Sequence, residues 1–408
     1  MANRENTNYE NTNHEKFKRE KPKKNTAVKI AALVILIAAV GIYLYLGGRN
    51  KDAVAAFEFD ETDAAFDFNY DEKADIYSNG TKNFFLTTKD GMNLYTSGKE
   101  VKWTQVYPLS LKEPLMAGRG DYVGICDANG LVFYMFSAED GLLFSKNYEN
   151  KILSFSVSPG GYSSVICKDG EDYTVQAFNA KGDEINCYYV RDENIFPVTS
   201  AISNDGRILA ISLIDINASV MTSKLMMLYN NSGEKQEFLN GIFHQESRED
   251  EFIGKLEFLA KGELLFLSDK NLSCMSTELT DFIKPALKWE LPLSNEVDSV
   301  AVAKGETIAV AFGKPVPGKE AVKEGLVRVY NPEFHQLGEY EYNGAVSLSS
   351  SGSFIVASCG RKHSVINSKG KMLWEYNAVS DVKKLAVLDN QNTAVFLDNL
   401  HAQVIKKR

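Results

Sequence analysis

The chain has few of the residues from which catalytic and metal sites are usually built. Its 408 residues include five histidines and five cysteines. The histidines show no H-x-x-x-H or H-x-H spacing, so nothing supports a zinc site or a histidine base. A G-x-S-x-G nucleophile motif and a phosphate-binding glycine loop are also missing. We therefore expect no enzyme activity, no cofactor and no metal.

A basic excess is missing as well. The formal net charge is −9, which argues against nucleic acid as the main partner. The charge is divided unevenly, because residues 1–29 carry eight basic and four acidic side chains whereas the remainder carries 37 basic and 50 acidic ones. Prolines number ten, against 23 Phe and 19 Tyr, a ratio typical of β-strands rather than of low-complexity sequence.

One long apolar run is present, and it separates the basic from the acidic part. It extends from Ile30 to Leu46 without a charge, and with its apolar neighbours it reaches the roughly 20 residues that a helix needs to cross a bilayer. Basic residues crowd the segment before it, whereas only Arg49 and Lys51 follow closely. By the positive-inside rule, the N-terminus stays in the cytoplasm.

These features predict a single-pass protein of the cell membrane in four parts. We expect a disordered basic cytoplasmic tail at 1–27, a transmembrane signal-anchor helix at 28–48, a linker at 49–56 and an extracytoplasmic domain at 57–408. The alternative is a cleaved signal peptide, because Ala53-Val54-Ala55 resembles a cleavage site.

The extracytoplasmic part contains a unit of four short strands that recurs eight times. The repeat is clearest in its second strand, which is strongly apolar at residues 84–88, 122–126, 164–167, 209–212, 264–268, 308–311, 354–358 and 394–398. Glycines such as Gly206 and Gly370 recur in the turns before the second and fourth strands, where hairpins require a positive φ. Four antiparallel strands in roughly 40 residues are typical of a β-propeller blade.

We therefore predict an all-β fold, an eight-bladed β-propeller with seven blades as the alternative, preceded by one transmembrane helix. The last unit supplies only three strands, at residues 384–388, 393–397 and 403–405. Residues 57–70 form an alternating strand without a blade of its own, so we expect them to complete the last blade and close the ring.

The five cysteines are expected to be free and mostly buried. Cys126, Cys167 and Cys359 occupy equivalent second-strand positions, and equivalent positions of adjacent blades lie too far apart for a disulfide. A single bridge that involves Cys187 is left open.

Two kinds of repeat motif carry a resemblance to known families. Residues 368–376 (SKGKMLWEY) resemble the Gly-Lys-x-x-Trp repeat ending of pyrroloquinoline-quinone-type propellers. The Ser203-Asn204-Asp205-Gly206 turn is similar to turns of tryptophan–aspartate-repeat propellers. The whole layout resembles an uncharacterised family of bacterial proteins that have a basic tail, one membrane helix and an external propeller. This resemblance implies a fold and a location but no catalytic residue.

Three long segments stand out as candidate partner-binding loops. In a propeller, loops from the second to the third strand and from one blade to the next emerge on the same face, and we assign Ile214–Lys224, Phe238–Phe252 and Gly313–Gly325 to these two classes. Loops of this kind usually carry binding, although neutral drift explains them equally well. The candidate contact residues are Phe243, His244, Glu246, Glu249, Asp250, Glu251, Phe252, Lys314, Lys319 and Glu320.

Two functions follow from this pattern. The first is a membrane-tethered interaction or assembly scaffold that binds an envelope protein or a cell-wall component through loops of blades 4 to 6. The second is an extracytoplasmic ligand sensor or enzyme with a site in the central channel. The first is favoured because the inner strands, such as Leu256-x-Phe258 and Val300-x-Val302, look mainly apolar. The oligomeric state is not predicted.

Overall fold

The computed structural model describes residues 59–67, 73–108, 110–217, 219–230, 241–278, 284–293, 296–304, 306–316, 319–388, 391–399 and 401–407. Of residues 59–67, 314–316 and 319–323 it describes the backbone only. The predicted tail, membrane segment and linker lie outside this part of the chain. Within it, no helix is long and apolar enough to cross a membrane.

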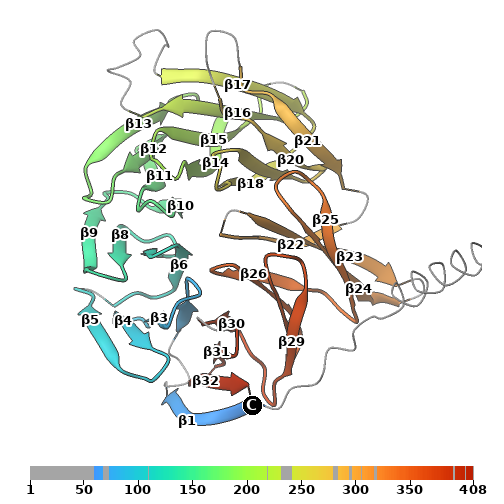
Figure 1. Ribbon diagram of the computed structural model, residues 1–408. Helices are drawn as coiled ribbons and strands as arrows, with labels where there is room; N and C mark the ends of the chain where they lie inside the picture. Colours follow the sequence, from blue (N-terminus) through green and yellow to red (C-terminus); the bar gives the residue numbers. More distant parts are fainter. Residues whose placement is uncertain are drawn as a thin grey trace, which may run out of the picture. The chain divides into compact units, whose positions relative to one another are not determined.

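The described strands form eight four-stranded antiparallel sheets (Figure 1). Blade 1 consists of β2 (Asp75–Tyr77), β3 (Asn83–Thr87), β4 (Gly91–Thr96) and β5 (Val101–Val106). Blade 2 consists of β6 (Pro114–Arg119), β7 (Tyr122–Asp127), β8 (Val132–Ser137) and β9 (Gly141–Asn147). Blade 3 consists of β10 (Ile152–Val157), β11 (Ser163–Asp169), β12 (Asp172–Phe178) and β13 (Glu184–Val190).

The middle of the chain forms two further blades in the same way. Blade 4 consists of β14 (Ile195–Ile202), β15 (Ile208–Asp215), β16 (Thr222–Tyr229) and β17 (Ile242–Glu249). Blade 5 consists of β18 (Ile253–Phe258), β19 (Leu264–Ser268), β20 (Asn271–Met275) and β21 (Leu287–Pro292).

The C-terminal part supplies the remaining blades. Blade 6 consists of β22 (Glu296–Ala303), β23 (Thr307–Val316), β24 (Lys319–Tyr330) and β25 (Gln336–Tyr342). Blade 7 consists of β26 (Ser347–Ser351), β27 (Phe354–Cys359), β28 (Lys362–Ile366) and β29 (Met372–Asn377). Blade 8 combines β30 (Lys384–Val387), β31 (Thr393–Leu397) and β32 (His401–Lys407) with β1 (Phe59–Asp67).

Blade 8 closes the ring with both ends of the propeller sequence. Its strand order is β1-β32-β31-β30, and β1 pairs antiparallel with β32 from Phe59↔Lys407 to Asp67↔His401. A register shift between Glu61 and Ala65 interrupts this pairing. The structure therefore confirms eight blades rather than seven, and it confirms that the N-terminal strand completes the last blade.

The hydrophobic core is divided among the interfaces between blades. Ile166 and Val175 of blade 3, for example, share one cluster with Leu209 and Ile211 of blade 4. Eight such clusters occupy the eight interfaces of the ring. Because both faces of each sheet are covered, the second strands are continuously apolar instead of alternating.

The turns follow the glycine pattern of the sequence. Gly206, before the second strand of blade 4, has a φ of 72°, and Gly370, before the fourth strand of blade 7, has a φ of 73°. These left-handed conformations are readily adopted by glycine. All five cysteines are free, and Cys126, Cys167 and Cys274 are buried, as predicted.

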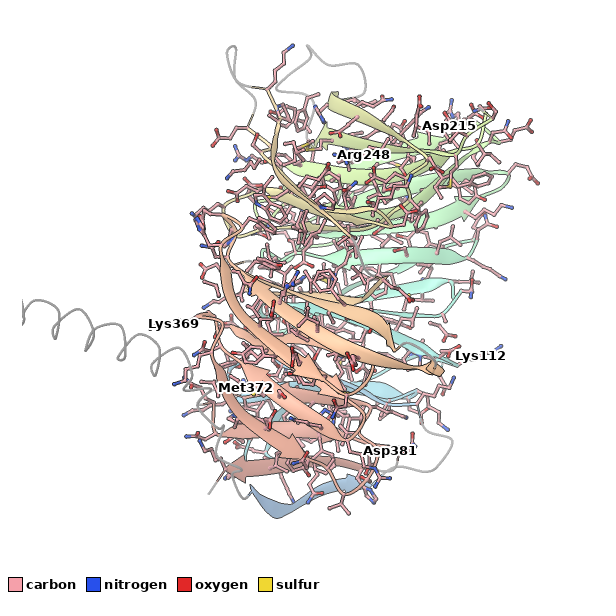
Figure 2. All side chains as sticks on the ribbon, turned by 90° about the vertical axis from the view of Figure 1, so that its right-hand side faces the viewer. Lys112, Asp215, Arg248, Lys369, Met372 and Asp381 are labelled. Atoms are coloured by element: carbon pink, nitrogen blue, oxygen red, sulfur yellow. The ribbon has the colours of Figure 1, made fainter. Side chains whose placement is uncertain are left out.

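Two faces of the ring can be distinguished from the strand order. We call top face the side where second strands connect to third strands and one blade connects to the next, and bottom face the opposite side. Figure 2 shows Asp215, Lys112 and Asp381, which lie at or in such connections, along one edge of the molecule. Lys369, in the turn between β28 and β29, lies at the other edge.

Three loop predictions need correction. Most of Phe238–Phe252 is not a loop, because residues 242–249 form β17, the outer strand of blade 4. The segment Ile214–Lys224 contains strand residues at both ends, so the connection between β15 and β16 is limited to 216–221. Gly313–Gly325 is mostly strand: β23 and β24 pair from Gly313↔Gly325 to Pro315↔Lys323, and after a register shift at Val316↔Lys319. In addition, two long connections, 230–241 and 276–286, join third to fourth strands and so belong to neither of the two predicted classes.

Candidate functional site

The predicted contact residues of blade 4 lie mainly on β17 and in the short turn after it. Phe243 stacks on Tyr229 with ring centroids 4.3 Å apart, so it packs within the blade. The Nε2 atom of His244 lies 3.9 Å from a carboxylate oxygen of Glu246. Glu249, the last residue of β17, and Asp250, in the turn after it, are exposed, and Asp250 is ion-paired with Lys270 at 2.7 Å.

Arg248 gathers the remaining acidic side chains into one network between blades 4 and 5. Its Nε donates to Glu246 at 2.8 Å and its Nη1 to Glu290 of β21 at 2.6 Å. The same Nη1 lies 3.5 Å from Glu251, which is 6% exposed and accepts a hydrogen bond from Ser268. Arg248 and Glu251 therefore link neighbouring blades, and the Glu246 carboxylate is held by Arg248 of its own strand.

The other predicted contact residues are placed as follows. Phe252 is 37% exposed in the top-face connection between blades 4 and 5. Lys314 lies on β23, and Lys319 and Glu320 lie on β24, in the hairpin of blade 6. Phe252, Glu249 and Asp250 therefore lie on the top-face surface as predicted. Phe243, Glu246 and Glu251 do not form part of that surface.

The central channel contains a cavity that opens toward the bottom face. Its volume is about 710 Å³. First strands of the blades run from the top to the bottom face, and the cavity is lined by their final residues and by the turns that follow them. Apolar wall residues include Phe155, Val157, Leu256 and Phe258.

Three charged side chains meet in this cavity. Arg119, the last residue of β6, donates from Nη1 to the carbonyl oxygen of Val302 at 2.8 Å, and its Nη2 contacts Glu257 of β18. Lys255 of β18 donates to the carbonyl oxygen of Val300 at 2.6 Å and lies 3.8 Å from Glu257. The two carbonyl groups belong to β22, an inner edge strand whose free side faces the channel.

The cluster carries one excess positive charge, since two cations share the Glu257 carboxylate. The Lys255 side chain is 40% exposed, whereas that of Glu257 is 9% exposed. Desolvation, together with the neighbouring Arg119, lowers the pKa of Lys255 to about 8. Burial raises the pKa of Tyr77, so its hydroxyl stays a neutral donor to the carbonyl oxygen of Gly120 at 3.1 Å.

Serine hydroxyls add polar groups to the same wall. Ser156 and Ser200 line the cavity, and both hydroxyls bond to Ser164, at 2.7 and 2.8 Å. The cavity mouth carries Asp121, Lys304 and Glu306. Charged and hydroxyl groups beside apolar walls are the usual composition of a small-molecule site.

The sequence pattern did not predict this cluster. Leu256 and Phe258 indicated an apolar inner strand, but Lys255 and Glu257 alternate with them along β18. The available signal was the presence of Arg119, Lys255 and Glu257 near the ends of predicted first strands, because such positions converge on the axis of a propeller.

The fold and the cavity define the chain as an eight-bladed β-propeller with a polar cluster in its channel. A model of a family of unknown function, DUF5711, matches residues 58–406, and the chain belongs to this family. No curated protein sequence matches it.

Solved structures show the same kind of fold at low sequence identity. Sqt1 from Chaetomium thermophilum is similar with a TM-score of 0.54 and 11% identity, covering 86% of this chain and 100% of that one. Hsv2 from Kluyveromyces marxianus gives 0.45 and 13%, covering 72% and 91%. The Pan2 WD40 domain of Neurospora crassa gives 0.41 and 10%, covering 88% and 91%. The likeness to Sqt1, which has the one TM-score above 0.5 among these three, concerns the fold alone at 11% identity.

Proposed function

We propose that this protein is a membrane-tethered, extracytoplasmic scaffold that binds an envelope protein through the top face of its propeller. The tether and its orientation rest on the apolar run 30–46 and the basic residues before it. The binding role rests on the surface of the propeller. A β-propeller fold is compatible with this role and does not require a catalytic step.

The observation that carries the proposal is the position of the exposed apolar side chains. Most of the large apolar residues with substantial exposure lie in top-face connections or at strand ends beside them. They are Val106, Leu115, Leu131, Leu153, Ile216, Val220, Phe252 and Val379. Apolar groups that gather on one side of a soluble domain commonly mark a protein-interaction surface.

Charge on the same face indicates the chemistry of the partner. Exposed carboxylates lie in the top-face connections of blades 3 and 4 or at the strand end beside them, at Glu171, Asp192, Glu193 and Glu249. An acidic surface with apolar groups suits a basic, partly apolar segment of an envelope protein. A cationic cell-wall component is the alternative partner for this acidic, partly apolar surface.

Crosslinking in intact membranes tests the proposal. A variant with Val106→Glu, Val220→Glu and Val379→Glu alters only exposed top-face positions, with Val379 82% exposed. Val101→Glu with Leu287→Glu is the matched control, because these two exposed residues begin fourth strands at the bottom end. We expect the top-face variant to lose an envelope protein that carries a basic segment, while the control keeps it. Identical captured proteins from both variants would contradict the proposal.

The channel supports a second function, that of a ligand sensor. The specific observation is the group of Arg119, Lys255 and Glu257 inside a cavity of about 710 Å³. Because the cavity opens at the bottom face, a small ligand and a top-face protein partner can bind at the same time.

A further inference from the structure

The channel cavity has the size and wall chemistry of a small-molecule site. Its volume of about 710 Å³ falls within the range of about 300–1,000 Å³ that is usual for ligand pockets. One part of the wall is apolar, with Phe155, Val157, Leu256 and Phe258. Another part presents the cations Arg119 and Lys255. A ligand that matches both parts has an apolar body and an anionic group.

The charge balance of the cluster indicates the sign of that group. Glu257 is contacted by Arg119 and lies 3.8 Å from Lys255, so a single carboxylate faces two cations. A structural link between blades 2 and 5 needs only the Arg119–Glu257 pair. Lys255 adds a second, partly exposed cation at the cavity wall. Partial removal of this ammonium from water costs free energy, and a further anion in the cavity offsets that cost.

The cavity mouth indicates how much charge the ligand carries. Asp121 and Glu306 face the entrance with Lys304. With Lys304 beside them, the two carboxylates leave one excess negative charge at the entrance, which repels a polyanion more strongly than a monoanion. A carboxylate is therefore favoured over a phosphate ester, which carries up to two negative charges.

We propose that the cavity binds a small organic carboxylate, with the acid group at Lys255 and Arg119 and the apolar body along Phe155, Leu256 and Phe258. Charge-assisted hydrogen bonds from an ammonium and a guanidinium hold a carboxylate more strongly than neutral donors do. The Ser156–Ser164–Ser200 hydroxyl chain, which uses two of its three protons in its own hydrogen bonds, retains one further donor beside the same wall. This site is independent of the top-face surface.

Calorimetric titration of the full chain in a non-ionic detergent tests the site. The probes are acetate, 4-phenylbutyrate and the neutral 4-phenylbutyramide. We expect 4-phenylbutyrate to bind at least about tenfold more tightly than either the amide, which lacks the charge, or acetate, which lacks the apolar body. Equal affinity for the acid and the amide contradicts the proposal, and so does the absence of acid binding up to about 10 mM.

Three variants locate the bound acid. Lys255→Met is expected to weaken binding of 4-phenylbutyrate by at least about tenfold, while Lys255→Arg restores most of it. Lys369→Met removes a cation from a bottom-face turn outside the cavity and leaves the affinity unchanged. Thermal unfolding of each variant confirms that the propeller is intact. Unchanged affinity in Lys255→Met places the acid elsewhere and overturns the assignment.

Discussion

Arg119 of blade 2 reaches Glu257 of blade 5 across the channel of the propeller. Its guanidinium also donates to the carbonyl oxygen of Val302 in blade 6, the blade opposite its own in a ring of eight. One side chain therefore links three blades that share no sheet. The link lies near the bottom end of the first strands, where it crosses the cavity that also contains Lys255.

Removal of the two partners of this link is expected to have unequal effects. Glu257→Gln leaves Arg119 and Lys255 together without a carboxylate, so we expect it to lower the free energy of unfolding by about 3 kcal/mol. Arg119→Met costs less, because Lys255 lies 3.8 Å from Glu257 and still compensates its charge. Denaturant unfolding of both variants and of the double variant measures the difference.

The surface pair Arg361–Asp381 provides the comparison for this experiment. Its atoms lie 2.7 Å apart, but its side chains are 58% and 82% exposed, so Asp381→Asn should change stability by less than about 1 kcal/mol. If Glu257→Gln has an equally small effect, the cross-channel link is not a stabilising element.

Binding of an organic carboxylate in the channel is expected to weaken at alkaline pH. The pKa of Lys255 is lowered to about 8, so its ammonium form attracts the acid below that pH and is lost above it. The groups that face it are Arg119, Glu257 and, at the cavity mouth, Asp121, Lys304 and Glu306. Affinity for 4-phenylbutyrate should therefore fall between about pH 7 and pH 9.5, by up to roughly tenfold.

The Lys255→Arg variant is the control for this pH dependence. A guanidinium stays charged over the whole range, so the variant should bind the acid with nearly constant affinity. A wild-type affinity that does not change with pH would show that Lys255 does not contribute its charge to binding.

The blade count was predictable from the sequence because packing between blades imposes one strong local pattern. Each second strand is covered on both faces, so segments such as Leu209–Ile211 and Ile308–Ala311 are apolar without interruption. The role of β1 was predictable for a related reason. Three strands in the last unit leave an edge at β32, and residues 57–70 form the one alternating segment without a blade.

The outer strands and the channel were harder to predict because their residues do not form continuous apolar runs like those of the second strands. β17 has an alternating pattern in which Gln245, Ser247 and Glu249 are exposed, which looks like a polar loop in the sequence. Arg119 and Glu257 are 138 residues apart, so only the closure of the ring brings them together. Their pairing depends on the fold and cannot be read from either segment alone.

His363 is expected to make the propeller less stable in mild acid. The side chain is fully buried on β28, its Nδ1 lies 2.8 Å from the Ser358 hydroxyl, and burial lowers its pKa to about 4. The unfolded chain takes up the proton near pH 6.5, so stability present above that pH is lost as the pH falls toward 4. Between about pH 7 and pH 5 the loss attributable to this residue is about 2 kcal/mol.

Two histidine variants isolate this contribution. In His363→Phe the unfolding free energy should decline less between these pH values than in the parent protein, whatever its absolute stability. His335→Gln alters an exposed histidine and should leave the decline unchanged. An identical decline in His363→Phe and the parent would rule out His363 as the source.

The five thiols are expected to react slowly in the folded protein. Burial raises the pKa of Cys126 and Cys274 to about 12, and burial also raises the pKa of Cys167, Cys187 and Cys359. A thiol rather than a thiolate is therefore present near pH 8, and thiols are poor nucleophiles. Labelling followed by mass spectrometry should show five modified cysteines after denaturation and far slower modification before it. Fast labelling of native Cys126 would contradict this.

Strand β1 is expected to be essential for closure of the ring. It pairs with β32 from Phe59↔Lys407 to Asp67↔His401, so its removal leaves an unpaired edge on blade 8. A chain that starts at residue 54 retains β1 and should unfold cooperatively as a monomer. A chain that starts at residue 72 should unfold at least about 5 °C lower and associate through the free edge of β32.

Addition of the missing strand as a peptide distinguishes lost closure from general damage. A synthetic peptide of residues 57–70 should pair with β32 and raise the unfolding temperature of the shortened chain, as strand addition does at other sheet edges. A scrambled peptide of the same composition has no matching pattern and should have no effect. Equal stability of the two shortened chains, with no response to the peptide, would show that seven complete blades and a three-stranded eighth hold the ring closed without β1.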